Sequence, residues 1–147
     1  MKKFTFGLDT VLGYKNQILS SLKMEHGKIL EKMNAQETVL EELKLKYVEC
    51  NSEFSEKKTA GMTIIEARGF GIYLSQIEHQ IKLESEKLVE IKKIEDKKRF
   101  EVVECRKESA AIEKLREKKM EQYDKEVKKR DELFIEEFVS NAMASVN

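Results

Sequence analysis

Hydrophobic side chains recur at alternating intervals of three and four residues along the first part of the chain. Over residues 8–54 this spacing selects fourteen positions, eleven of them apolar. A repeat of this kind places its members on one narrow stripe of a continuous α-helix, which is typical of a coiled-coil seam. The positions are Leu8, Leu12, Lys15, Leu19, Leu22, His26, Ile29, Met33, Gln36, Leu40, Leu43, Tyr47, Cys50 and Phe54. The pattern therefore predicts one long helix with a stripe that must be buried against a partner.

The repeat stops within residues 57–71, which contain three of the six glycines in a chain without proline. Gly61 can adopt the left-handed conformation that ends a helix. Thr63, followed three residues later by Glu66, matches the capping box that begins a new helix. We therefore expect one helix to end and another to begin within a few residues.

The same spacing resumes after the break, at Phe70, Leu74, Ile77, Ile81, Glu84, Leu88 and Ile91. Beyond residue 91 the apolar positions drift through Ile94, Val102, Cys105, Ile112, Leu115, Tyr123 and Val127. The uneven gaps predict a stutter that locally unwinds the supercoil. No glycine follows Gly71, so no second break is expected.

Two long helices joined by a short turn lie antiparallel and can hide their stripes against each other. Each fully buried aliphatic side chain stabilises this pairing by about 1.5 to 3 kcal/mol. The predicted fold is all-α, a long antiparallel two-helix coiled coil in which the second helix is longer. We expect a single hairpin over residues 1–147, with helices at about 4–58 and 63–142, a tip at about 59–63 and a frayed C-terminal tail.

The hairpin geometry also predicts which residues lie level with each other. With the bend near Gly61, residue i should face about residue 122 minus i, so Phe4 should face about residue 118. Everything from Met120 to about Ala142 should then project beyond the first helix. The projecting part carries an apolar stripe of Tyr123, Val127, Phe134 and Phe138, flanked by Leu133 and Val139. Such a stripe is expected to bind a partner, to pair with a second copy or to fray.

Composition and charge exclude several classes of protein. With 38% charged and 7% aromatic residues, a compact core is difficult to build. Basic and acidic residues are equal at 28 each, so no net charge attracts nucleic acid or an anionic membrane. Asp9 interrupts the N-terminal apolar patch, and no apolar run is long enough to span a membrane. We expect a soluble, cytosolic protein without direct membrane insertion.

Candidate reactive groups are few and scattered. The hairpin rule places Cys50 and Cys105 ~50 Å apart and His26 and His79 ~25 Å apart, so no disulfide or shared metal site is expected. His26 is interpreted as a partly solvated filler of the seam. The G-x-G at residues 69–71 lacks the third glycine and the preceding strand of a nucleotide-binding loop. We expect no enzyme, no cofactor and no catalytic residue.

Three stretches resemble one known family. Residues 4–12 read F-x-F-x-L-x-x-V-L and are followed by the basic Lys15. Residues 73–81 and residues 113–133 (EKLREKKMEQYDKEVKKRDEL) occur in the expected order and spacing. Together the three stretches resemble FliJ-type flagellar export proteins over nearly the whole chain.

The resemblance implies a function that the helical pattern alone does not supply. Members of this family are antiparallel coiled coils, similar to the central stalk of rotary ATPases, in the flagellar type III export apparatus. They bind the hexameric export ATPase, promote assembly of its ring, connect it to the cytoplasmic domain of the export gate and escort export chaperones. The resemblance thus implies a role in flagellum biogenesis, chemotaxis and motility. It also implies a monomer when free, located in the cytoplasm and peripherally associated with the inner membrane at the flagellar base.

The resemblance and the hairpin geometry together suggest two sets of contact residues. The candidates for ATPase binding are Phe4, Phe6, Leu8, Tyr123, Val127, Phe134 and Phe138. The candidates for binding the export gate are Gln36, Leu40, Leu43, Tyr47, Phe70, Leu74, Ile77 and Ile81, which also belong to the seam. Two alternatives stay open: a structural coiled coil whose projecting end self-associates, and the cognate stalk of a virulence type III secretion system or a rotary ATPase.

Overall fold

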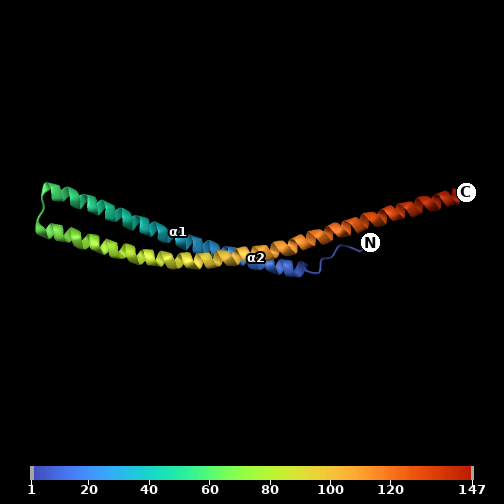
Figure 1. The fold of residues 1–147 in the computed structure, drawn as a ribbon, viewed down its shortest axis with the longest axis horizontal. Helices are drawn as coiled ribbons and strands as arrows, with labels where there is room; N and C mark the ends of the chain where they lie inside the picture. The colour runs from blue at the N-terminus through green and yellow to red at the C-terminus, as the bar shows by residue number, and fades with distance from the viewer. Residues whose placement is uncertain (1, 147) are drawn as a thin grey trace. The chain divides into compact units, whose positions relative to one another are not determined.

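The computed structural model describes residues 2–146, which form two α-helices that pack against each other as a hairpin (Figure 1). Helix α1 spans Asp9–Ala60 and helix α2 spans Ile64–Val146. The predicted fold class, an all-α hairpin with a longer second helix, is confirmed. The hairpin divides into two compact units, described separately below. Residues 22–102 form the turn unit, and residues 2–21 with 103–146 form the terminal unit.

The turn between the helices follows from its local chemistry. Gly61 has a φ of 101°, a left-handed value that side chains disfavour, and its N–H donates to the Lys57 carbonyl oxygen at 2.9 Å. The Thr63 hydroxyl accepts a hydrogen bond of 3.2 Å from the N–H of Glu66, which would otherwise be unpaired at the start of α2. The predicted roles of Gly61 and Thr63 are confirmed.

The outer ends of the helices differ from the predicted bounds. Helix α1 begins at Asp9 rather than near residue 4, and α2 continues to Val146 rather than ending near residue 142. The residues before Asp9 alternate apolar side chains at Phe4, Phe6 and Leu8, which is the period of an extended chain and not of a helix. The Asp9 carboxylate in the first turn then favours a helix start there, because the N-terminal end of a helix is electropositive.

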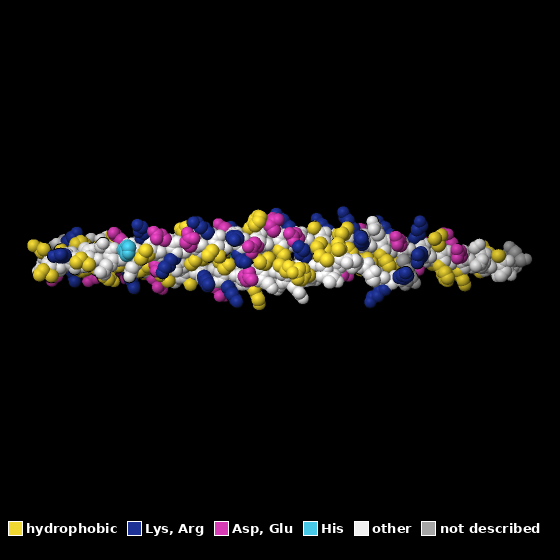
Figure 2. Space-filling view, turned by 90° about the horizontal axis from the view of Figure 1, so that it is seen from below, with side chains coloured by type: hydrophobic (Ala, Val, Ile, Leu, Met, Phe, Trp, Pro, Cys, Tyr) yellow, Lys and Arg dark blue, Asp and Glu magenta, His cyan; other side chains and the backbone are white. Residues whose placement is uncertain are grey.

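The predicted stripe of α1 faces α2 at every helical position. Its members from Leu12 to Phe54 are all buried or half-buried, whereas Leu8, which precedes the helix, is 39% exposed. The buried hydrophobic side chains of the two units are Phe6, Leu12, Leu40, Cys50, Leu74, Ile77, Val102 and Cys105. Outside the seam, basic and acidic side chains intermingle along the face seen in Figure 2.

The seam of α2 keeps its regular spacing for longer than the sequence pattern suggested, as far as Arg116. The covered positions after Ile91 keep the regular spacing, at Glu95, Lys98, Val102, Cys105, Ser109, Ile112 and Arg116. Ile94 and Leu115, which the apolar pattern assigns to the stripe, are 55% and 41% exposed. The next covered positions are Met120, Tyr123 and Val127, so two intervals of four residues meet at Arg116. Two such intervals in succession are the spacing that a stutter produces, and the stutter stays a prediction. Before Arg116 the apolar pattern does not follow the seam, because this seam also accepts polar residues, most of which have a partner on α1.

Those polar partners confirm the predicted register within each unit. In the turn unit, His26 should face about residue 96, and its ring contacts the Glu95 carboxylate at 3.0 Å. The Lys98 ammonium donates to Glu25 on α1 at 2.8 Å. In the terminal unit, Lys15 should face about residue 107, and its ammonium donates to Glu108 at 2.5 Å.

Ser109 is a seam residue without a hydrogen-bond partner. It is 4% exposed, and its hydroxyl oxygen has no hydrogen-bond partner among the described residues. A buried hydroxyl in this state has lost its hydration without compensation. The small side chain fits between the helices, but its hydroxyl group makes no hydrogen bond that stabilises the fold.

We predict that Ser109→Ala raises the free energy of unfolding by about 1 to 2 kcal/mol, because it removes the unpaired hydroxyl and replaces Ser by a better helix former. Chemical denaturation followed by circular dichroism measures the change. The matched control is Ser75→Ala, at an exposed position of α2, which reports the helix-propensity part alone. An equal gain in both variants would show that the Ser109 hydroxyl carries no penalty.

Candidate partner-binding surfaces

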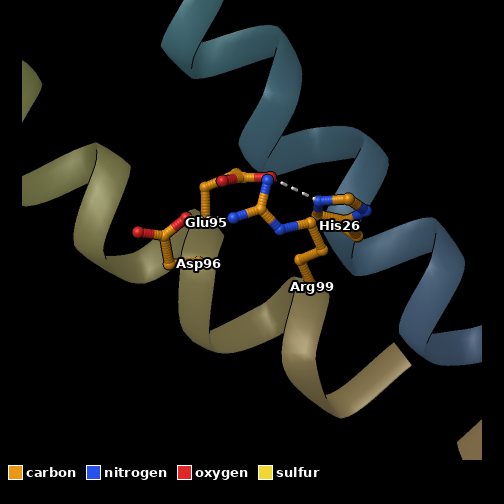
Figure 3. A network of polar contacts seen from close by, with 4 residues as sticks. All are labelled: His26, Glu95, Asp96 and Arg99. Atoms are coloured by element: carbon orange, nitrogen blue, oxygen red, sulfur yellow. Dashed lines mark hydrogen bonds and ion pairs between the residues drawn. The ribbon is translucent and has the colours of Figure 1, made fainter. Parts of the chain in front are cut away.

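The turn unit contains a polar cluster within the seam, formed by His26 on α1 and three residues on α2 (Figure 3). Glu95, 7% exposed, lies 3.0 Å from the His26 ring nitrogen and 3.9 Å from the Arg99 guanidinium. Arg99 also pairs with Asp96 at 2.5 Å. His26 is half-buried in the seam, in line with its interpretation as a partly solvated filler, but that interpretation did not include its hydrogen bond to Glu95.

The cluster acts on the pairing of the helices rather than on a substrate. The hydrogen bond with His26 lowers the pKa of Glu95 below its ordinary value, burial opposes this shift, and the charge of Arg99 adds to it. A carboxylate in the seam is costly unless it is paired. Sliding one helix past the other would separate Glu95 from His26, so the pair favours one register.

We predict that Glu95→Gln destabilises the hairpin most at neutral pH and least in acid. A carboxyl group whose pKa is lowered by folding stabilises the protein at pH values above its pKa in the unfolded chain. This contribution is lost as the pH falls through the pKa of the folded state. Thermal unfolding of both proteins between about pH 7 and pH 3 measures the difference. A difference that stays constant across this range would contradict an ionised Glu95 in the seam.

The eight candidates for gate binding all lie in the turn unit and face the opposing helix. Leu40, Leu74 and Ile77 are buried, and Gln36, Leu43, Tyr47, Phe70 and Ile81 are half-buried. The Gln36 amide donates to the Glu84 side chain and backbone oxygen, and the Tyr47 hydroxyl donates to Glu78 at 2.9 Å. These hydrogen bonds lower the pKa of Glu84 and raise the pKa of Tyr47. The set is thus part of the seam, and its contact with a partner stays a prediction.

An open groove lies beside these residues, close to the turn. The side chains of Phe70 and Cys50 contribute apolar surface to it, and Tyr73 is 48% exposed at its edge. A Cβ added at Gly69 would meet nothing within 4 Å, so packing within the chain does not require glycine there. The groove is lined by Lys46, Glu49, Cys50, Glu53, Glu66, Gly69, Phe70 and Tyr73. Glu49 and Tyr73 were not among the candidates for gate binding. Those candidates were chosen by the spacing of the seam, and Glu49 and Tyr73 lie beside it.

The terminal unit holds the seven candidates for ATPase binding, and the N-terminal segment covers part of them. The Phe4 ring lies 5.4 Å from that of Tyr123, whose hydroxyl donates to the Lys2 carbonyl oxygen at 2.5 Å. Phe6 is buried, and Val127 is half-buried. From Met120 onward α2 projects beyond α1, as predicted, but the N-terminal segment covers Tyr123, which was expected to be uncovered. Residues 2–6 are not helical (Figure 1), and an extended chain reaches ~3.3 Å per residue against 1.5 Å in a helix.

Beyond this segment, α2 has an uncovered apolar face. Every described residue from 128 to 146 is exposed. Phe134 and Phe138 are 70% and 67% exposed, although aromatic rings of this size usually find a neighbour to pack against. We call the line of Phe134 and Phe138 on this part of α2 the overhang stripe. Further exposed apolar side chains lie around the helix beside it, at Leu133, Ile135, Val139 and Met143. Phe134 and Phe138, predicted from the sequence, lie one helical turn apart on it.

The described residues contain two thiols and no candidate metal cluster. No group of three His, Cys, Asp or Glu side chains in that part of the chain could hold a metal ion. Cys50 and Cys105 are free thiols, each buried in its own unit. Neither described helix contains a stretch that is long and apolar enough to cross a membrane.

The fold and its surfaces define a helical hairpin that presents apolar side chains to other molecules. Comparison with protein families identifies which hairpin this is, because the family described as Flagellar FliJ protein matches residues 4–147. The chain belongs to the FliJ family, as the resemblance indicated, and is a component of the flagellar export apparatus. This family is a non-catalytic part of that apparatus. Neither the curated proteins nor the solved structures include a match to this chain.

We predict opposite effects of substitutions in the covered and uncovered parts of α2. Changing both Phe134 and Phe138 to Ser should alter the free energy of unfolding by less than about 0.5 kcal/mol, because these rings have no cover to lose. Tyr123→Ala should lower it by about 1 to 3 kcal/mol through loss of the contact with Phe4. Chemical denaturation measures both. Strong destabilisation by the double substitution would mean that the overhang stripe packs within the chain.

Proposed function

We propose that this chain is a non-enzymatic coupling element of the flagellar type III export apparatus. Its terminal unit binds the hexameric export ATPase and promotes assembly and activity of the ring. Its turn unit contacts the cytoplasmic domain of the export gate, and the chain also escorts export chaperones. The partners come from the family resemblance. The observation that carries the proposal is the overhang stripe, where Phe134 and Phe138 are uncovered on a continuous helix.

The overhang stripe has the properties of a helix that docks in a groove. Phe134 and Phe138 are four residues apart, so their rings project from one face of α2, with Leu133 and Val139 beside them. Large aromatic side chains of this kind supply most of the binding free energy in many interfaces. Leaving both rings in water would be unfavourable, and a partner that covers them gains that free energy on binding.

The turn unit supports the second contact through the groove beside its seam. Phe70, one of the gate-binding candidates, lines this groove, and the half-buried Tyr47 is held by its hydrogen bond to Glu78. We propose that the accessible edges of such candidates touch the gate, whereas buried members such as Leu40 and Ile77 hold the two helices at the correct spacing. A contact at each unit would suit a coupling element.

The proposed place of action follows from these partners. The chain acts in the cytoplasm and reaches the inner membrane at the flagellar base through the export gate. It supports chemotaxis and motility through flagellum assembly, and it regulates the ATPase without hydrolysing nucleotide itself.

We predict that the variant with Phe134→Ser and Phe138→Ser binds the purified export ATPase at least about 30-fold more weakly than the unchanged chain. The estimate assumes two apolar anchors worth about 1 to 2 kcal/mol each. Stimulation of ATP hydrolysis should fall in parallel. Isothermal titration calorimetry and a steady-state ATPase assay measure the two effects. The control is Ser140→Ala, which lies on the same part of α2 but away from the face of Phe134 and Phe138.

The outcome separates the proposal from its alternative. Normal binding and stimulation by the double variant would mean that the overhang stripe does not contact the ATPase. Sedimentation of the chain alone tests self-association. A dimer that forms through the stripe, and that the double variant abolishes, would favour the structural coiled coil over the ATPase-binding protein.

A further inference from the structure

The apolar face of α2 in the covered region and the overhang stripe lie on the same side of the helix, separated by one turn that carries Arg130 and Asp131. Tyr123, Val127, Phe134 and Phe138 follow each other at intervals of four, seven and four residues, which places them on one side of a helix. The first two are half-buried, whereas Phe134 and Phe138 are 70% and 67% exposed. The covered and uncovered halves therefore belong to one surface.

Residues 2–5 cover Tyr123 through few contacts. The Phe4 ring packs against Tyr123 at 5.4 Å and is itself only half-buried. Among the described residues, one hydrogen bond joins this segment to α2, from the Tyr123 hydroxyl to the Lys2 carbonyl oxygen. The side chains of Lys2, Lys3 and Thr5 are exposed.

The next residue toward the helix is held differently. Phe6 is 6% exposed, and its carbonyl oxygen accepts a hydrogen bond of 3.2 Å from the Asp9 N–H at the start of α1. Phe6 therefore anchors the segment at one end, whereas the four residues before it depend on the Phe4 ring and a single hydrogen bond. Ordering such a segment costs conformational entropy at every residue, which its few contacts oppose.

We propose that residues 2–5 are a displaceable strap over the ATPase-binding surface of α2. This inference rests on the proposed function, in which the ATPase binds the overhang stripe. The ATPase first contacts Phe134 and Phe138 and then extends its contact to Val127 and Tyr123 by displacing the strap. Phe6 stays in place as the anchor. The strap thereby reduces the affinity of the free chain and delays full engagement.

The strap predicts the opposite result from a direct contact of Phe4 with the ATPase. A ring that touches the partner contributes affinity, so its removal weakens binding. A ring that holds a competing cover lowers the fraction of chains ready to bind, so its removal strengthens binding. Removing the Phe4 ring therefore distinguishes the two roles, because the affinity for the ATPase rises if Phe4 belongs to a cover and falls if Phe4 contacts the ATPase.

We expect Phe4→Ala to bind the purified export ATPase about 3- to 10-fold more tightly than the unchanged chain, because more of the chain is then ready to bind. The matched control is Thr5→Ala, in the same segment but exposed, which should bind as the unchanged chain does. Unchanged or weaker binding by Phe4→Ala would overturn the strap.

A spectroscopic measurement follows the strap directly. The chain contains no tryptophan, so a Phe4→Trp variant labelled with 5-fluorotryptophan carries one fluorine, at the strap. We expect its ¹⁹F resonance to move, on saturation with unlabelled ATPase, to the position that a further Tyr123→Ala substitution gives in the free chain. A resonance that stays at the free-chain position would show that the strap remains on α2. A resonance that moves to neither position would show that the ring at position 4 contacts the ATPase, which would also overturn the strap.

The variant with both Phe134 and Phe138 changed to Ser keeps the two hypotheses apart. If this variant binds the ATPase normally, the proposed function is wrong, and the strap loses its basis with it. If this variant loses binding while Phe4→Ala binds no more tightly than the unchanged chain, the proposed function stands and the strap alone is wrong.

Discussion

Neither helix can bury its apolar stripe alone, so α1 and α2 pair along it, and the rest of the structure depends on this pairing. A stripe with a regular repeat looks similar after one helix slides by seven residues, so apolar contacts alone discriminate weakly between registers. The polar seam residues supply this discrimination, because Glu95 in the turn unit gains a hydrogen bond from α1 only in the register in which it meets His26. In the terminal unit, Lys15 with Glu108 and Arg116 with Asp9 make further pairs across the helices. Partly exposed pairs of this kind contribute less to stability than to the choice of register.

The surfaces left for binding are those that the pairing does not use. Within the turn unit the seam covers many of the apolar side chains, and the groove beside Phe70 is one of the accessible surfaces that remain. Within the terminal unit α1 begins at Asp9 while α2 continues, so the stripe of α2 loses its partner and meets first the N-terminal segment and then solvent. Function in this molecule is therefore expected where the pairing of helices stops.

The candidate contact residues show which exposed and covered positions the helical periodicity could predict. Phe134 and Phe138 were predicted correctly as uncovered, because a helix that outruns its partner has no neighbour there whatever the details of packing. Tyr123 was assigned to the same uncovered face, yet it contacts Phe4. Helical periodicity alone could not show this, since the reach of a segment depends on whether it is helical or extended. Glu95 and Ser109 were overlooked because a search for apolar spacing passes over polar residues that occupy the seam.

The sequence by itself determined the two helices, the turn at Gly61 and the register, because all three follow from local periodicity, from one left-handed glycine and from the fixed rise of a helix. The tertiary structure decided which side chains at equivalent positions are core and which are surface. Ile94 is exposed and Glu95 is buried although they are neighbours in the chain, since burial depends on the direction of a side chain relative to the opposing helix and on the partner it meets there. The course of residues 2–6 over α2 was likewise decided by contact between distant parts of the chain, which local periodicity does not encode.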